Sequence, residues 1–167
     1  MGIMGPSSDS LISVIIPLYN KERSIYRAIS SVLSQKDVRI EVIVVDDGST
    51  DGSKEVIQPF TDQIILIEQE NRGPSAARNR GVAHSHGEYL AILDADDELL
   101  PGSLHAHLEC RRHYQGTKVT LSSYKVVCPD GRVYSELLYT RVERLQHRDC
   151  CYYTKTFHAE LIVGANP

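Results

Sequence analysis

The chain has 167 residues, 41% hydrophobic and 24% charged, which suits one globular domain with its own core. Its formal net charge of -4 excludes the broad basic surface that holds nucleic acid, so we expect no nucleic-acid partner. No apolar run approaches the ~20 residues of a membrane-spanning helix. The four cysteines form no Cys-x-x-Cys pair, which favours reduced thiols and a cytoplasmic location. Residues 1–10 lack the pattern of a secretory signal, and we expect a flexible leader there.

Strand-like and helix-like segments alternate along the first two thirds of the chain. Taken in order, the pattern predicts a strand at 11–17, a helix at 24–35, a strand at 40–45, a short helix from about 50 to 60, a strand at 63–68, a helix at 74–85, a strand at 88–93 and a helix at 101–112. Proline at position 74 suits the first turn of its helix. This alternation predicts an α/β fold, with a mostly parallel sheet flanked by helices.

The pattern changes after this α/β part. Residues 118–139 form two strand-like runs around a Pro-Asp-Gly turn at 129–131, which predicts an antiparallel hairpin. The tail, 140–167, is polar and irregular apart from the apolar run in "LIVGANP". We expect that run to expose an apolar edge, which would favour a homodimer or poor solubility.

Acidic residues concentrate where the predicted strands end. The first strand leads into "PLYNKE" (17–22), the second into Asp46 and Asp47, and the fourth into "DADDE" (94–98). Ligands of open α/β sheets bind outside the carboxyl ends of the strands. We therefore expect a cleft that combines an aromatic ring with several carboxylates. Two acids at the end of a buried strand are costly unless solvated, so we expect this strand to end at a solvated cleft.

The sequence lacks both common phosphate-binding loops, Gly-x-Gly-x-x-Gly after the first strand and Gly-Lys-Ser/Thr. An acidic site can instead hold phosphate through a divalent cation, and carboxylates suit Mg²⁺ or Mn²⁺. Asp94 and Asp96 would face the same side of an extended chain. Taken singly, an Asp-x-Asp, a "DDGST" segment or Tyr19 has an ordinary structural explanation as a turn, a helix cap or core packing. Their combination, each after a strand, indicates a site.

The segments "SVIIPLYNKERSIYRAISSVLSQ", "EVIVVDDGSTDGS" and "NRGPSAARNRGVAHSHGEYLAILDADDELLPGSL" resemble inverting, GT-A-fold glycosyltransferases of family 2 over about 11–104. The resemblance implies that 11–167 is the donor-binding part of a GT-A domain, incomplete at its C-terminus. It implies sugar transfer from a nucleotide-diphosphate sugar, often UDP- or dTDP-linked, to a hydroxyl acceptor, with Mn²⁺ or Mg²⁺. The acceptor would be a saccharide or glycolipid, in polysaccharide or glycolipid assembly at the cytoplasmic face of a membrane, with peripheral association.

Carried over residue by residue, the resemblance implies a role for each site residue. Tyr19 would lie against the base, Asp47 would accept a hydrogen bond from the base's ring N–H, and Asp46 would fix the loop. Asp96 would be the main metal ligand, and Asp94 would bind ribose or metal-bound water. Arg78 would lie near the nucleotide or would pair structurally with an aspartate. The nucleotide-binding set is thus Pro17, Tyr19, Asn20, Asp47, Arg78 and Asp94, and the metal set is Asp96 and Asp94.

An inverting transferase also needs a general base to deprotonate its acceptor. The family carries this acid after the Asp-x-Asp, usually in a Glu-Asp pair. None of the acids after position 102 stands in such a pair: Glu109, Asp130, Glu136, Glu143, Asp149 and Glu160. We therefore expect a truncated piece with little turnover, whose base is unidentified. Two alternatives stay open: a non-catalytic nucleotide-sugar-binding module and, with less support because "PLYNKERS" lacks a glycine-rich basic signature, a sugar nucleotidyltransferase.

Overall fold

The computed structural model describes residues 10–113, 119–121, 124–127, 132–136 and 161–164. A six-stranded sheet runs through it in the order β3-β2-β1-β4-β8-β5. The strands are β1 (Leu11–Leu18), β2 (Arg39–Asp46), β3 (Ile65–Glu68), β4 (Tyr89–Ile92), β5 (Val119–Leu121) and β8 (Leu161–Gly164). Strands β1 to β4 are mutually parallel, while β8 is antiparallel to β4 and β5. The expected α/β fold with a mostly parallel sheet is confirmed.

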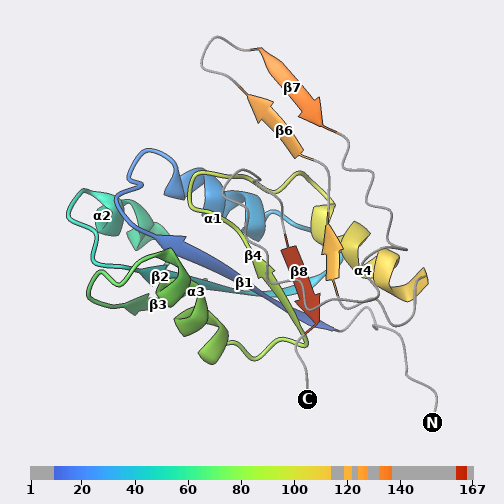
Figure 1. Cartoon of the computed structure of the whole chain (residues 1–167), viewed down its shortest axis with the longest axis horizontal. Coiled ribbons are helices and arrows are strands. Elements are labelled where there is room, and N and C mark those ends of the chain that lie inside the picture. The colour runs from blue at the N-terminus through green and yellow to red at the C-terminus, as the bar shows by residue number, and fades with distance from the viewer. Residues whose placement is uncertain (1–9, 114–118, 122–123, 128–131, 137–160, 165–167) are drawn as a thin grey trace.

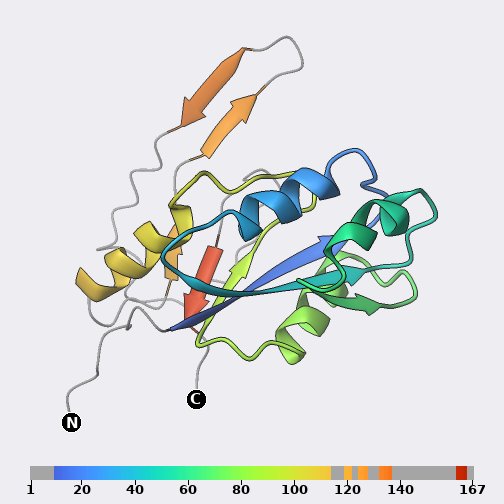
Figure 2. The ribbon, with the colours of Figure 1, turned by 180° about the vertical axis from the view of Figure 1, so that it is seen from behind.

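Helices cover both faces of this sheet (Figures 1 and 2). One face carries α1 (Ile25–Leu33), α2 (Ser53–Ile57), the 3-10 turn η1 (Gln58–Phe60) and α4 (Ser103–His113). The opposite face carries α3 (Pro74–Ala83), which packs on β1 and β2. A sheet covered on both faces needs strands that are apolar on both sides, which explains the continuous apolar runs in β1 and β2.

Strand β1 shows how the sequence fills both layers of the core. Ile12, Val14 and Ile16 belong to the cluster under α1 and α4, whereas Ile15 belongs to the cluster under α3. This follows from the two-residue period of a strand, which points successive side chains to opposite faces. Pro17 is tolerated because β4 pairs with β1 only as far as Ile15, so the missing N–H falls beyond the β4 ladder.

Helix α3 approaches the sheet closely because its inner face is made of small residues. Ala77 and Gly81, one turn apart, are both buried against the sheet. A Cβ added at Gly81 would lie 2.4 Å from Ile15 Cγ2, well inside the distance that atoms tolerate. The helix therefore lies where only a glycine fits, and its position fixes where its first turn meets the strand ends.

The direction in which the chain adds strands to the sheet reverses at β1. From there the chain builds β2 and β3 on one side and then returns to place β4 on the other. In open α/β sheets such a topological switch point opens a crevice at the carboxyl ends of the two strands, and ligands bind there. The segments that follow β1 and β4 are therefore expected to form the binding site.

The C-terminal part differs in two respects from the sequence expectation. The hairpin is confirmed: β6 (Tyr124–Val127) and β7 (Val133–Glu136) form a separate antiparallel pair, and the turn at 129–131 lies outside the described residues. However, β5 does not continue into it and joins the main sheet instead. The expectation of an irregular tail with an exposed apolar edge is wrong at 161–164, because these residues form β8 with a strand on each side.

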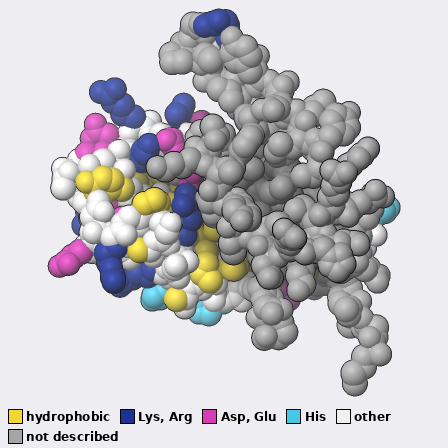
Figure 3. Space-filling view, in the orientation of Figure 1, with side chains coloured by type: hydrophobic (Ala, Val, Ile, Leu, Met, Phe, Trp, Pro, Cys, Tyr) yellow, Lys and Arg dark blue, Asp and Glu magenta, His cyan; other side chains and the backbone are white. Residues whose placement is uncertain are grey.

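The structure also describes the start of the chain from Ser10 and the distribution of charge on one face of the surface. Residues 1–9 lie outside the described part, but Ser10, placed at the end of the expected leader, is buried and donates a hydrogen bond to Glu88. No helix in the described ranges is long and apolar enough to span a membrane. On the face of the described part seen in Figure 3, basic and acidic side chains are interspersed rather than gathered by sign.

Candidate functional site

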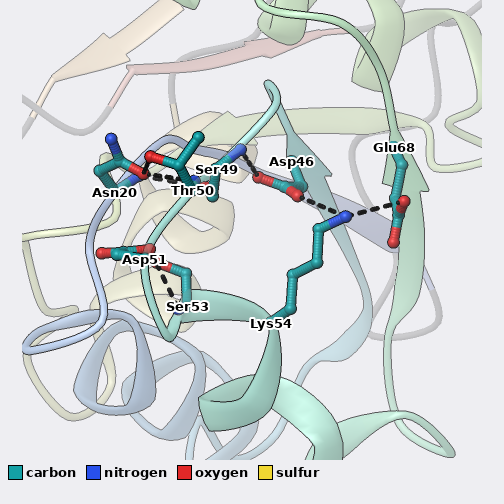
Figure 4. A network of polar contacts seen from close by, with 8 residues as sticks. All are labelled: Asn20, Asp46, Ser49, Thr50, Asp51, Ser53, Lys54 and Glu68. Carbon is teal, nitrogen blue, oxygen red and sulfur yellow. Dashed lines mark hydrogen bonds and ion pairs between the residues drawn. The ribbon is translucent and has the colours of Figure 1, made fainter.

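The loops that follow β1 and β2 are interlocked by side chains. Asn20 Oδ1 accepts a hydrogen bond from the Thr50 N–H at 2.8 Å, and the Asn20 N–H donates to Ser49 Oγ at 3.0 Å (Figure 4). Asn20 has a left-handed backbone, with φ of 50°, a conformation that asparagine adopts more readily than most residues. The asparagine expected to bind nucleotide is therefore engaged in joining two loops.

The same interlock continues through the next residues. The Lys21 N–H donates to Ser53 Oγ at 2.9 Å, and the Glu22 N–H donates to Asp51 Oδ2 at 3.1 Å. In return, Glu22 Oε2 accepts the Gly52 N–H at 3.0 Å. We call residues 20–22 and 49–53 the loop clamp. It fixes the backbone from which the Lys21 side chain starts.

Asp46 ends β2 with a fully buried side chain that holds its own turn. Its Oδ1 accepts the Ser49 N–H at 3.0 Å, as expected of a residue that fixes this loop. Its Oδ2 lies 3.5 Å from Lys54 Nζ, which also donates to Glu68 at 2.9 Å (Figure 4). The hydrogen bond to Glu68, assisted by the Asp46 charge, raises the pKa of Lys54 above its ordinary value. This lysine therefore stays charged and compensates the buried carboxylate.

Asp47 is 3% exposed and holds the loop between β3 and α3. Its Oδ1 accepts hydrogen bonds from Gln69 Nε2 at 2.7 Å and the Arg72 N–H at 2.8 Å, and its Oδ2 accepts the Gly73 N–H at 2.8 Å. The expectation that the two acids are tolerated by solvent is therefore wrong. Both are buried. Loop N–H groups donate to them, and Lys54 lies 3.5 Å from Asp46 Oδ2 as an ion-pair partner, contacts that local sequence does not reveal.

Gly48 makes this arrangement sterically feasible. It has a φ of 76°, which favours glycine, and a Cβ there would lie 3.0 Å from the Asn71 backbone nitrogen. The loop after β3 can therefore approach Asp47 closely enough for its N–H groups to reach the carboxylate. One of about four acceptor positions of that carboxylate has no described donor.

Tyr19 follows β1 directly and is 45% exposed. It stands between the buried Leu18 and the clamp residue Asn20, so its backbone is held on both sides. Pro17, the other predicted nucleotide contact from this strand, is half-buried within β1. Of these two residues, Tyr19 is therefore the more exposed.

The Asp-x-Asp segment follows β4 on the other side of the switch point. Leu93 and Ala95 are buried, while Asp94 and Asp96 are partly exposed, so the expected alternation is present. The segment is not extended, however. The Asp97 N–H donates to the Asp94 carbonyl at 3.0 Å, which closes a turn. A turn was not anticipated, yet it leaves both carboxylates outside the core.

Each carboxylate of the Asp-x-Asp is paired with a cation from another segment. Lys21 Nζ lies 2.6 Å from Asp96 Oδ2, with side chains 41% and 43% exposed. Arg78 Nη2 lies 2.7 Å from Asp94 Oδ1, with side chains 16% and 40% exposed. The structure thus shows the alternative in which Arg78 pairs with an aspartate. Lys21 was not among the predicted site residues, and its position two residues after Tyr19 was the only signal.

These pairs join the loops that follow β1 and β4 to each other and to α3 at the switch point, the place that we call the crevice. Lys21 comes from the loop after β1, Arg78 from α3 on the opposite face, and both aspartates from the loop after β4. Among the described residues no group of three or more His, Cys, Asp or Glu side chains is arranged as a metal site. Two hard, partly exposed carboxylates do suit a cation that takes its other ligands from water and phosphate.

Comparison with known proteins identifies the family. The sequence model described as "Glycosyl transferase family 2" matches residues 13–156. The chain belongs to glycosyl transferase family 2. The resemblance stated from the motifs is therefore confirmed.

Named relatives of this family 2 domain are longer proteins. The succinoglycan biosynthesis protein ExoO of Rhizobium meliloti is 34% identical over 140 residues, which are 80% of this chain and 40% of ExoO. The glycosyltransferase GlyA of Streptococcus pneumoniae is 44% identical over 92 residues, 53% of this chain and 13% of GlyA. The chain thus spans less than half the length of these relatives.

Solved glycosyltransferases share the fold of this family 2 domain. The mannosyltransferase PcManGT from Pyrobaculum calidifontis, in complex with GDP-Man and Mn²⁺, superimposes with a TM-score of 0.61 at 28% identity, over 73% of this chain and 37% of that one. TarS of S. aureus, in complex with UDP-GlcNAc, superimposes with a TM-score of 0.58 at 27% identity, over 65% and 32%. The expected GT-A fold is confirmed.

Proposed function

We propose that this chain is the donor-binding part of an inverting glycosyltransferase that moves a sugar from a UDP- or dTDP-linked donor to a hydroxyl acceptor. The observation that carries the proposal is the meeting of the loop after β1 with the Asp-x-Asp loop at the β1–β4 switch point, where Lys21 contacts Asp96. Support comes from TarS and PcManGT, whose structures hold UDP-GlcNAc and GDP-Man.

The nucleotide would lie on the β1 side of the crevice. Tyr19 offers a half-exposed ring on which a base can stack. Pro17 and Asn20 flank it, and Asn20 contributes by holding the loop rather than by a free amide oxygen. The described donors fill three of the acceptor positions of Asp47, so the fourth would accept the ring N–H of a base, and Asp47 also shapes the loop beyond.

The diphosphate would lie on the β4 side, together with Mn²⁺ or Mg²⁺. Asp96 and Asp94 would hold the cation, because both present hard oxygen ligands toward solvent from one turn. A bound cation supplies the Lewis-acid neutralisation of the diphosphate leaving group. Arg78 orients Asp94 through its ion pair.

We assign no catalytic base among the described residues. Of the candidate acids, Glu109 pairs with Arg112 on α4 and Glu136 ends β7. The others, Asp130, Glu143, Asp149 and Glu160, lie outside the described residues. A saccharide or glycolipid acceptor, peripheral membrane association and a cytoplasmic location stay predictions that rest on the family. The low turnover expected from the sequence is likewise a prediction.

Calorimetric titration with UDP, dTDP, GDP and CDP, with and without Mn²⁺, tests the proposal. We expect one nucleotide to bind, with higher affinity when Mn²⁺ is present. An Asp96→Asn variant should bind that nucleotide without the gain from Mn²⁺. The matched control is Asp62→Asn, which removes an exposed carboxylate outside the crevice. A folded protein that binds none of the four nucleotides under either condition would contradict the proposal.

A further inference from the structure

We propose that Lys21 is a built-in counter-ion of Asp96 that sets how strongly this site takes a divalent cation and couples that binding to the nucleotide. The inference rests on the proposed function, because it assigns the cation to Asp96. It concerns a residue that the sequence pattern did not single out.

The backbone from which the Lys21 side chain starts is held by the structure around it. The Lys21 N–H donates to Ser53 Oγ, and the Lys21 carbonyl accepts the N–H groups of Ser24 and Ile25, each at 3.0 Å. The side chain thus starts from an anchored backbone and ends 2.6 Å from Asp96 Oδ2. Because all three backbone contacts survive a change of side chain, the charge at position 21 can be removed without loosening the loop clamp.

The two ion pairs of the crevice differ in how easily they exchange partners. Arg78, which holds Asp94, is 16% exposed and carries a planar guanidinium that suits a persistent pair. Lys21 and Asp96 are both more than 40% exposed, so water reaches both partners. An ammonium group on a flexible stem in water exchanges at low cost. Asp96 is therefore the carboxylate that can change its counter-ion.

A divalent cation and the Lys21 ammonium compete for the same carboxylate. Both are attracted to Asp96, and they repel each other when close. A nucleotide diphosphate brings negative charge to the crevice and gives the displaced ammonium a new partner. Cation and nucleotide should then strengthen each other's binding by the same factor, as linkage requires. Lys21 is in this sense a positioning residue, which acts through Asp96.

The size of the effect follows from the exposure of the pair. Exposed ion pairs contribute up to about 1 kcal/mol, which corresponds to about a fivefold change in a binding constant. Removing the charge should therefore tighten Mn²⁺ binding in the absence of nucleotide by about two- to fivefold. The factor by which nucleotide enhances Mn²⁺ binding should shrink to a similar extent, because the Lys21 ammonium, one source of that enhancement, is absent.

The test measures Mn²⁺ binding directly, from the electron paramagnetic resonance signal of free Mn²⁺. Wild type, Lys21→Met, Lys21→Arg, Lys36→Met and Asp96→Asn are titrated with and without the nucleotide that binds best. Lys36→Met is the matched control, since it removes the charge of an exposed lysine near the end of α1. Lys21→Arg keeps the charge and should bind Mn²⁺ no more tightly than wild type.

Tighter Mn²⁺ binding in Lys21→Met alone, at least twofold, would support the counter-ion role. Unchanged or weaker binding in Lys21→Met, while Asp96→Asn still loses Mn²⁺, would overturn that role and leave the cation site intact. If wild type and Asp96→Asn bind Mn²⁺ equally, with and without nucleotide, the cation site itself is wrong, and the role of Lys21 falls with it. The two proposals are thus separated.

Discussion

Asp46 and Asp47 lie side by side at the end of β2, but they hold different loops. Asp46 closes its own turn through Ser49 and pairs with Lys54. Asp47 reaches across to three donors of the segment 69–73. A buried carboxylate with several N–H donors is stable, whereas the same group without them would be costly. The pair of acids therefore organises the carboxyl edge of the sheet before any ligand is considered.

Replacing Asp47 by asparagine should destabilise the protein by about 2–3 kcal/mol. The amide keeps one acceptor oxygen and turns an NH₂ group toward N–H donors of the loop, so that buried donors lose their partners. Urea unfolding at pH 7 measures the change in the free energy of unfolding. Asp62→Asn, on the exposed loop before β3, should stay within about 0.5 kcal/mol of wild type. A similar small effect for Asp47→Asn would show that its three hydrogen bonds contribute little.

For single residues, the sequence predicted which side chains lie outside the core, but it did not predict which residues they contact. The outward position of Asp94 and Asp96 follows from the alternation with Leu93 and Ala95. The partner of Asp96 did not follow, because Lys21 is 75 positions away and its contact depends on strand order. The donors to Asp47 were likewise missed, since they belong to a loop whose path depends on where α3 packs.

At the scale of elements, α3 shows how a small residue sets a distance. Gly81→Ala should destabilise the protein by about 1–3 kcal/mol. The added methyl group would meet Ile15, and this strain outweighs the gain of about 1 kcal/mol in helix propensity. Thermal and urea unfolding measure the change. Asn79→Ala, on the exposed side of the same helix, is the matched control and should be neutral or stabilising. Equal stability of Gly81→Ala and wild type would contradict the close packing.

Local pattern predicted most of the elements because they are strongly periodic or strongly apolar. Helix α1 keeps Ile25, Ala28, Ile29 and Val32 buried at helical spacing, as the sequence indicates. The exceptions are β5 and β8: β8 pairs with β4 on one side and with β5 on the other, across long stretches of chain. Nothing within a four-residue run shows which edge it will join. For the same reason, the order of the strands in the sheet could not be predicted from the local sequence pattern.

At the scale of the whole molecule, one carboxylate ties three segments together at the edge opposite the crevice. Glu41 of β2 accepts hydrogen bonds from Ser13 of β1 and from the His86 and Gly87 N–H groups of the loop before β4. Burial alone would raise the pKa of Glu41, but the hydrogen bonds from Ser13 and His86 outweigh burial and lower it. The charged form of Glu41 therefore stabilises the fold.

The stability of the protein should accordingly depend on pH through Glu41. Because its pKa is lowered on folding, its contribution is complete above about 4.5 and is lost as the pH falls through the lowered value. Glu41→Gln should be less stable than wild type by about 1–3 kcal/mol at pH 7. The difference should shrink below pH 4.5, as chemical unfolding between pH 3 and 7 would show.

The control for this pH dependence is Glu55→Gln, an exposed carboxylate on α2. Its free energy of unfolding should follow that of wild type within about 0.5 kcal/mol at every pH. A constant difference between Glu41→Gln and wild type over the whole range would mean that the carboxylate contributes by shape and packing rather than by charge.

The place of β8 in the sheet has a consequence for the order of events during synthesis. Ile92 of β4 pairs with Leu161 of β8, so roughly 70 residues must leave the ribosome between the two strands. At ~5–20 residues per second this takes roughly 3–14 s. Throughout that interval the parallel strands β1 to β4 can already be paired while the outer edge of β4 lacks its partner. A nascent chain is then exposed to wrong strand pairing, and chaperone contact would matter most in that window.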